Sequence, residues 1–244
     1  MPELAHMTWQ GVDQLRQETD LVILPSGAVE VYGQHLPLGS DGIAALALAK
    51  GLAERVPAGI TPLVPVGESQ ALLPFPGTLW VSAESLKAYI GDIARSVIHW
   101  GFRRLLFINS HAGNVAVIGQ LARELQNEHG VICAQVDTWR FIQPFTEDLW
   151  ESTLPHGHAS EAGTSMLLHV APELVKMERA AQTTPPANPF PEFIRYRPYT
   201  DATDTGTVGD GAVGTTEKGA ETFKRAVDRL VAFVESDAFQ VPAA

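Results

Sequence analysis

Short apolar runs alternate with longer segments of helical period in the first part of the chain, and this alternation limits the folds that the chain can adopt. The runs are rich in branched side chains and end at Gly, Pro or Asn, which is typical of buried strands. They span residues 21–24, 60–66, 103–109 and 130–137. The amphipathic segments between them cover residues 41–56, 82–100 and 115–129. This pattern predicts a mostly parallel sheet with helices on both faces, and ligands bind such sheets beyond the carboxyl ends of the strands.

The pattern loosens after Trp139. A helix is expected over about 160–170 and another over 216–235. The Pro-rich passage 183–198 and the Gly- and Thr-rich passage 200–219 are interpreted as ordered loops that cover another part of the molecule. The chain has 244 residues, 45% of them hydrophobic, which is enough for one well-buried domain over residues 1–244.

Charge and composition disfavour several classes of function. The formal net charge of −11 argues against binding to nucleic acid or to anionic lipid. No apolar run reaches the roughly 18 residues of a membrane span, and "MPELAHMTWQ" lacks the basic-then-apolar pattern of a signal peptide. The single cysteine, Cys133, fits a reducing compartment, so we expect a cytoplasmic protein.

Polar groups of the kind that bind metals occur in three segments, each expected to come just after a strand. Carboxylates and imidazoles are ligands of Zn²⁺, Mn²⁺ and Fe²⁺. The groups are Glu30, Tyr32, His35 and Asp41 after the first strand, His111 after the third, and His156, His158 and Glu161 in "HGHASE". Each residue alone is weak evidence, because Asp41 could cap the following helix and His158 could be an ordinary loop histidine. Their concurrence at one edge of the sheet favours a functional site.

Five motifs resemble the creatininase (creatinine amidohydrolase) family. The family's G-x-x-E-x-H-G-x-H-L-P-L-x-x-D is similar to "GAVEVYGQHLPLGSD", and "FPGT" at 75–78 matches F-P-G-T. "NSHAGN" at 109–114 and "HASEAGTS" at 158–165 follow in the family's order, and "GTVGDGAVGTTEKG" at 206–219 matches a late glycine-rich motif. The resemblance covers almost the whole chain.

The resemblance implies a three-layer α/β/α sandwich with a mostly parallel central sheet, assembled as a homo-oligomer that is usually a hexamer. It implies one or two divalent ions per subunit (Zn, Mn or Fe) and hydrolysis of a C–N bond in a cyclic amide or formamide. The ligands of one ion map to Glu30, Asp41 and His111, and the aspartate bridges to a second ion. The proton shuttle maps to His158 and a residue lining the substrate pocket maps to Trp139.

Departures from the family pattern fall near the second ion. Tyr32 replaces a ligand histidine, and Gly113 and Gly163 stand where carboxylates occur in the family. The second site is therefore expected to be missing or rebuilt, with His35 and Glu161 turned inward. Tyr32 and His35 are candidate substrate contacts, and Glu161 could orient His158, act as a base or serve as a ligand. A second pocket tryptophan is replaced by Leu154, which argues against creatinine as the substrate.

The sequence predicts a metal-dependent hydrolase of a small molecule and leaves alternatives open. The first is an enzyme that opens a cyclic ketone of the inosose type by cleaving a C–C bond. The second is a degenerate, non-catalytic binding member of the family. The aromatic segment 188–199 is expected to cover the pocket or to contact another subunit, and its Arg195 and Arg197 could meet an anionic substrate.

Overall fold

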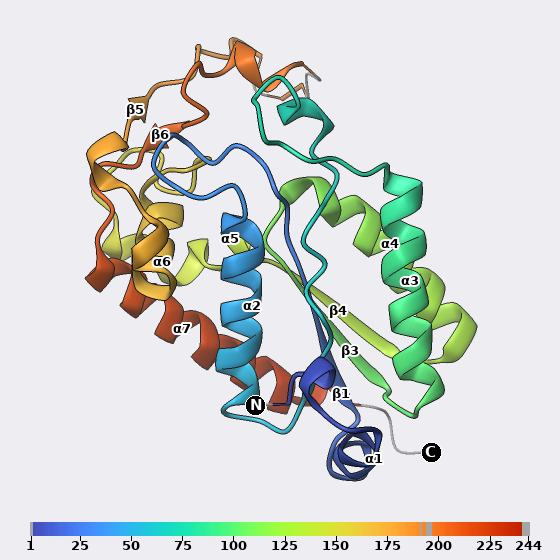
Figure 1. The fold of residues 1–244 in the computed structure, drawn as a ribbon. Helices are drawn as coiled ribbons and strands as arrows, with labels where there is room; N and C mark the ends of the chain where they lie inside the picture. The colour runs from blue at the N-terminus through green and yellow to red at the C-terminus, as the bar shows by residue number, and fades with distance from the viewer. Residues whose placement is uncertain (1, 191, 194–196, 241–244) are drawn as a thin grey trace.

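The computed structural model describes residues 2–190, 192–193 and 197–240, so Arg195 lies outside the described residues. A four-stranded parallel sheet forms the centre (Figure 1). Its strands are β1 (Leu21–Ser26), β2 (Gly59–Ile60), β3 (Arg104–Asn109) and β4 (Ile132–Asp137). The order in the sheet is β2-β1-β3-β4, and Ser26 of β1, Asn109 of β3 and Asp137 of β4 are aligned at the carboxyl ends.

Helices cover both faces of this sheet, which confirms the α/β/α sandwich (Figure 1). On one face, side chains of α2 (Ser40–Ala53), α6 (Glu161–Val170) and α7 (Thr216–Glu235) build two neighbouring apolar clusters. On the other face, α3 (Ala83–His99) and α4 (Val115–His129) pack together with α1 (Trp9–Glu18). β1 is buried along its whole length, because helices lie on both of its faces.

Local sequence signals set the ends of several helices. Ser82 accepts a hydrogen bond from the backbone N–H of Ser85 and so caps α3, and Thr215 caps α7 through the N–H of Lys218. Gly130 ends α4 in the left-handed conformation with φ 64°. These helices begin and end within one residue of the predicted segments.

Two elements differ from the sequence prediction. The expected strand 60–66 shrinks to β2, with one further bridge between Ser26 and Val64. Pro62 and Pro65 lack the N–H group that a continuous ladder needs, which explains the short strand. Helix α1 was not predicted, since its polar sequence buries only Leu15.

The short segments that follow β4 and α6 gather beyond the carboxyl ends of β1 and β3 (Figure 1). They include the short helix α5 (Thr138–Phe141) and the antiparallel pair β5 (Gln182–Thr183) and β6 (Gly209–Asp210). A single 3₁₀ turn, η8 (Tyr199–Asp201), contacts the turn η2 (Gln70–Leu72) from the loop after β2. Tyr199, the last residue of the segment expected to cover a pocket, thus lies beside the loop after β2. No helix in the described parts of the chain is long and apolar enough to cross a membrane.

Candidate metal centre

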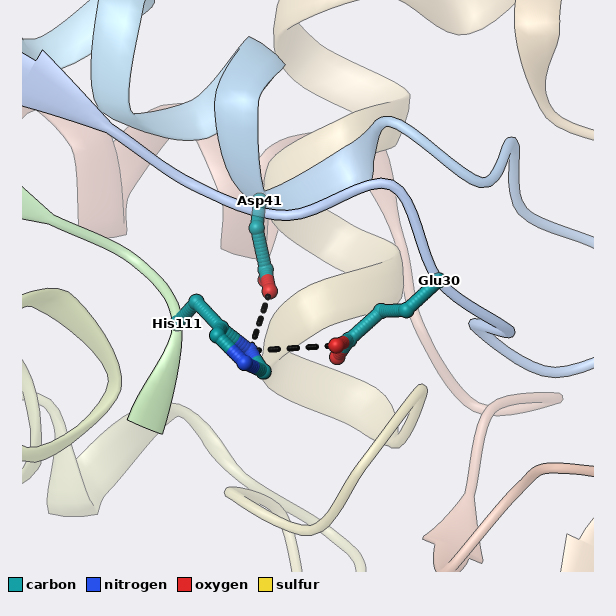
Figure 2. A group of neighbouring side chains, drawn as sticks. All are labelled: Glu30, Asp41 and His111. Carbon is teal, nitrogen blue, oxygen red and sulfur yellow. Dashed lines mark ion pairs between the residues drawn. The ribbon is translucent and has the colours of Figure 1, made fainter. Parts of the chain in front are cut away.

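Glu30, Asp41 and His111 converge beyond the carboxyl ends of β1 and β3 (Figure 2). Each offers one ligand atom, and the three atoms lie within 4.8 Å of one another. His111 Nδ1 is 3.1 Å from Glu30 Oε2 and 3.4 Å from Asp41 Oδ2. All three side chains are buried, and Glu30 and Asp41 are each 2% exposed. The structure therefore brings together the three residues that the sequence resemblance picked as ligands of one ion.

Backbone contacts hold the loop that carries Glu30. The N–H of Glu30 donates to the carbonyl of Leu38 at 2.9 Å, which closes the loop between β1 and α2. The N–H of Val31 donates to Thr78 Oγ1 at 3.2 Å, and the N–H of Leu79 donates to the carbonyl of Val29 at 2.8 Å. The "FPGT" segment and the residue after it thus hold the Glu30 loop in place through these hydrogen bonds.

Asp41 lies in the first turn of α2 but does not cap it. The N-cap residue is Gly39, and no side chain accepts a hydrogen bond there. The Asp41 side chain turns to His111, while its Oδ1 accepts a hydrogen bond from Trp139 Nε1 at 3.1 Å. The carboxylate also lies at a helix N-terminus, where the partial positive charge of the helix favours an anion.

His111 is oriented by the loop after β2. Its Nε2 lies 2.7 Å from the carbonyl of Glu68, and a carbonyl can only accept, so Nε2 carries the hydrogen. This leaves Nδ1 to face the two carboxylates. Ser69 donates from Oγ to Glu30 Oε2 at 2.6 Å. Asn114 accepts from the N–H of Glu68 at 3.0 Å and thereby fixes that loop against the start of α4. Such outer contacts set the orientation and basicity of metal ligands.

The electrostatics of the cluster favour a cation at its centre. Burial opposes ionisation of Glu30, but the hydrogen bond and charge of His111 outweigh it and lower the pKa of Glu30. Burial, helped by the charge of Glu30, raises the pKa of Asp41. Burial disfavours the charged imidazole, yet hydrogen bonds to Asp41 and Glu30 raise the pKa of His111 to about 11. The carboxylates therefore stabilise positive charge at Nδ1.

The spacing of the donor atoms fits a divalent ion. Ligands bound at about 2.0–2.2 Å with tetrahedral or octahedral angles lie roughly 3.0–3.4 Å from one another. The measured separations from His111 Nδ1 to the two carboxylates, 3.1 and 3.4 Å, fall in this range. Two carboxylates and a neutral imidazole also supply the two negative charges that balance such an ion.

His158 lies at the edge of the cluster between two tyrosine rings. Its Nε2 is 4.0 Å from Glu30 Oε1 and 2.6 Å from the carbonyl of Val31. The ring centroid of His158 is 4.5 Å from that of Tyr32 and 5.1 Å from that of Tyr199. The structure thus places an imidazole beside the centre and fixes its plane by packing.

Tyr32 and Trp139 complete the wall beside Asp41. Their ring centroids lie 6.2 Å apart, and Tyr32 is 3% exposed. Burial, with the nearby charges of Asp41 and Glu30, raises the pKa of Tyr32 well above its usual value, so the phenol stays neutral. Both residues therefore stand next to the centre, as the sequence led us to expect.

His35 and Glu161 are not brought to the cluster. His35 contacts Thr164 Oγ1 through Nε2 at 2.8 Å, and burial lowers its pKa to about 4, so it is a neutral packing residue between the loop and α6. The Glu161 carboxylate is buried and accepts from Lys218 Nζ at 2.5 Å and from the N–H of Ser152 at 2.8 Å. The expectation that these two side chains rebuild a second site thus has no support in their placement.

The first histidine of "HGHASE" also lies apart from the centre. His156 packs its ring edgewise against Trp150, with ring centroids 5.4 Å apart. Burial lowers the pKa of His156, since the charged imidazole would lose its hydration there. His156 is therefore a packing residue of the loop before α6.

Gly113 and Gly163, which stand where carboxylates occur in the family, have different surroundings. A Cβ atom on Gly113 would collide with the carbonyl oxygen of Glu68, so this position has no room for any side chain. A Cβ atom on Gly163 would lie 3.1 Å from Cε1 and 3.2 Å from the hydroxyl of Tyr32. The phenol ring therefore fills the space into which a side chain at 163 would project.

Sequence reasoning missed Ser69 and Tyr199. Ser69 lies in "GESQ" of the loop after β2, and Tyr199 lies in η8, far along the chain from the other site residues. A serine in a polar loop carries no signal of its own. For Tyr199, the expectation that segment 188–199 covers the pocket was the available signal.

A family model described as "Creatinine amidohydrolase" matches residues 5–234 of the chain. The chain belongs to the creatininase family. A "Mycofactocin precursor peptide peptidase" of Mycobacterium ulcerans (strain Agy99) is 28% identical over 95% of this chain and 91% of that protein. A "Creatinine amidohydrolase" of Pseudomonas putida is 28% identical over 88% of this chain and 89% of that protein. The solved structure "Creatininase Mn" is 25% identical, with a TM-score of 0.84 over 98% of both chains.

These findings confirm the resemblance seen in the motifs. Creatininase-family members are metal-dependent amidohydrolases, so this chain is a hydrolase of that class. The Glu30–Asp41–His111 triad is its candidate metal-binding site.

Proposed function

We propose that this creatininase-family chain hydrolyses the C–N bond of a compact amide, such as a cyclic amide or a formamide, at a divalent cation bound by Glu30, Asp41 and His111. The observation that carries the proposal is the convergence of these buried ligands directly beside His158, whose Nε2 is 4.0 Å from Glu30 Oε1. A metal triad next to a positioned imidazole supplies the parts that amide hydrolysis needs.

The bound cation would polarise the amide carbonyl and make the attacking water more acidic. The residues of the chain would do the rest. Glu68 and Ser69 keep the His111 imidazole and the Glu30 carboxylate in place. His158 would accept the proton of the attacking water at Nδ1, the ring nitrogen without a hydrogen, and would give its Nε2 hydrogen to the leaving nitrogen, which becomes a neutral amine. Tyr32 and Tyr199 hold the His158 ring during this transfer.

The enclosure of the centre favours a compact substrate. Tyr199 reaches the site from the loop between β5 and β6 and packs against His158. Glu30, Asp41 and His111 are nearly fully buried. Leu154 stands where the family's second pocket tryptophan occurs, which supports a substrate other than creatinine.

A peptide is a second candidate substrate. The mycobacterial relative named as a peptide peptidase matches this chain over 95% of its length, and a peptide presents the same C–N bond. The difference between the candidates is size, because a peptide must pass the segment that carries Tyr199.

The test is a substrate panel with metal-loaded protein: lactams, formamides, short peptides and cyclic diketones. We expect release of an amine from at least one of the amides. Opening of a cyclic ketone without any C–N cleavage would overturn the proposal in favour of C–C hydrolysis. A chain that retains its fold and metal but turns over none of these would favour the non-catalytic alternative.

Two variants test the roles of the residues. Glu30→Gln should lose most of its metal in elemental analysis, because it removes one of the two charges that balance the ion. His158→Ala should keep its metal and lose about 10²–10⁴-fold in turnover, the usual contribution of a positioned acid–base group. Full metal content in the first variant, or unchanged turnover in the second, would contradict the assignment. The assembly of the chain into a homo-oligomer, which the family resemblance implies, stays a prediction, and light scattering can test it by measuring the mass of the particle in solution.

A further inference from the structure

The surroundings of the candidate metal centre bear on how many ions it holds, a question that rests on the proposed metal-dependent function. We propose that the chain binds one divalent cation, because Tyr32, Trp139 and His158 occupy the places from which a second ion would need ligands.

A second ion would have to share oxygens with the first. Paired ions in hydrolytic centres lie about 3.5–4 Å apart and are bridged by common ligands. Glu30 Oε2 and Asp41 Oδ2 face His111 Nδ1 and are directed to the first ion. The carboxylate oxygens that remain to bridge to a second ion are Glu30 Oε1 and Asp41 Oδ1. The atoms around these two oxygens therefore decide whether a second ion can bind.

Asp41 Oδ1 is already bound by a hydrogen-bond donor. Trp139 Nε1 donates to it at 3.1 Å. An indole N–H has no lone pair to offer, so it stabilises the negative oxygen but cannot ligate a cation. The Tyr32 ring, 6.2 Å from the Trp139 ring between centroids, fills the adjoining space.

Glu30 Oε1 also faces a donor. Its neighbour, 4.0 Å away, is His158 Nε2, which lies 2.6 Å from the carbonyl of Val31. Because a carbonyl only accepts, this nitrogen carries a hydrogen and is not free to ligate. The ring is held in that orientation between Tyr32 and Tyr199.

Tyr32 and Gly163 form a size-matched pair that closes the remaining space. A Cβ atom at 163 would come within 3.1 Å of the Tyr32 ring, which is closer than ordinary packing allows. A side chain at 163 would therefore require the phenol ring to shift. Across the described parts of the chain, Glu30, Asp41 and His111 form the single cluster of three or more ligand residues.

The test counts ions in the intact chain. The protein is stripped with a chelator, reloaded with excess Zn²⁺ alone or Mn²⁺ alone, freed of excess ion by gel filtration, and analysed for metal and protein. We expect one ion per chain and a single binding step in calorimetric titration. Two tightly held ions would overturn the inference while leaving the metal centre intact. No bound ion would overturn the metal-dependent function and the inference with it.

Two variants test whether Tyr32 sets the count. Tyr32→His combined with Gly163→Glu supplies an imidazole and a carboxylate in the space of the phenol, and we expect a second ion to bind. Tyr32→Phe is the matched control, because it keeps the ring and should keep one ion. A folded double variant that still binds one ion would show that Tyr32 does not set the number. Should the double variant not fold, Tyr32→His alone takes its place, with the second ion expected at lower affinity.

Discussion

Glu161 offers a sharp test of the difference between a catalytic carboxylate and a structural one. The family pattern made it a candidate for the chemistry, whereas the structure engages its buried carboxylate elsewhere. It accepts from Lys218 Nζ at 2.5 Å, from the N–H of Ser152 at 2.8 Å and from the N–H of Glu151 at 3.1 Å. Glu161→Ala removes all three contacts and leaves the loop before α6 without its anchor.

The cost follows from these contacts. Each backbone hydrogen bond contributes about 1 kcal/mol and a charge-assisted one about 1.5–3 kcal/mol. Lys218 keeps two partners, Glu151 Oε1 at 2.7 Å and the carbonyl of Val213 at 3.1 Å, so its charge is not stranded. We therefore expect Glu161→Ala to lower the free energy of unfolding by about 3 kcal/mol, near the lower end of the range for broken buried pairs. In a chain of this size the melting temperature falls by about 6–12 °C.

The assay is urea unfolding of wild type and variants at one fixed metal concentration. Glu161→Gln keeps an acceptor for the backbone N–H groups and should lose only part of the stability. Glu147→Ala, an exposed glutamate of the same region, is the control and should stay within about 0.5 kcal/mol of wild type. If Glu161→Ala unfolds like wild type but loses its metal, Glu161 belongs to the metal centre and this reasoning is wrong.

The pH dependence has a definite sign. Burial opposes ionisation of Glu161, but the Lys218 hydrogen bond and the backbone N–H groups outweigh it, so its folded pKa is lowered. The stabilisation is therefore fully present above the ordinary glutamate pKa of about 4.3 and is lost as pH falls through the folded value. The stability gap between wild type and Glu161→Gln should stay constant from pH 6 to 8 and narrow below about pH 4.

Three further substitutions probe the surroundings of the site and one helix end. Ser69→Ala removes the hydroxyl that donates to Glu30 and should weaken Zn²⁺ binding about 10–100-fold in a chelator competition; unchanged affinity would remove Ser69 from the site. Gly113→Ala places a methyl group against the Glu68 carbonyl and should cost about 1–3 kcal/mol in urea unfolding, whereas Gly119→Ala on the open side of α4 should be neutral or stabilising. Thr215→Ala removes the cap of α7 and should lower the unfolding free energy by about 1 kcal/mol, and a loss below 0.2 kcal/mol would show that the cap is not used.

Periodicity predicted the sheet and its main helices because burial imposes it. β1 and β3 lie between two layers of helices, so their central residues are apolar, and α3 repeats its apolar positions along one face. Where burial is weak the pattern fails. Helix α1 buries only Leu15 and was missed, and prolines cut the expected strand 60–66 to two residues.

The metal triad could be predicted because its residues follow strand ends that the topology places at one edge. Glu30 and His111 come after neighbouring strands, and Asp41 opens the helix that follows the first of them. The order of strands and helices does not predict the direction in which a side chain points. Glu161 begins α6 and is buried, yet it turns to Lys218, a residue from a helix far along the sequence. Residue type and position alone therefore led to the prediction that Glu161 takes part in catalysis, which its contacts do not support.

The glycines near the site show why single positions mislead. Gly27 and Gly113 are needed because backbone atoms, of Gly42 and of the Glu68 carbonyl, approach where a side chain would begin. Those contacts come from backbone atoms, so in this chain a side chain at either position would require the facing backbone to shift. Gly163 differs, because its neighbour is the Tyr32 side chain. A larger side chain at 163 can be accommodated by a smaller one at 32. Whether this part of the metal centre can offer further ligands therefore depends on both residues together, and neither position alone predicts it.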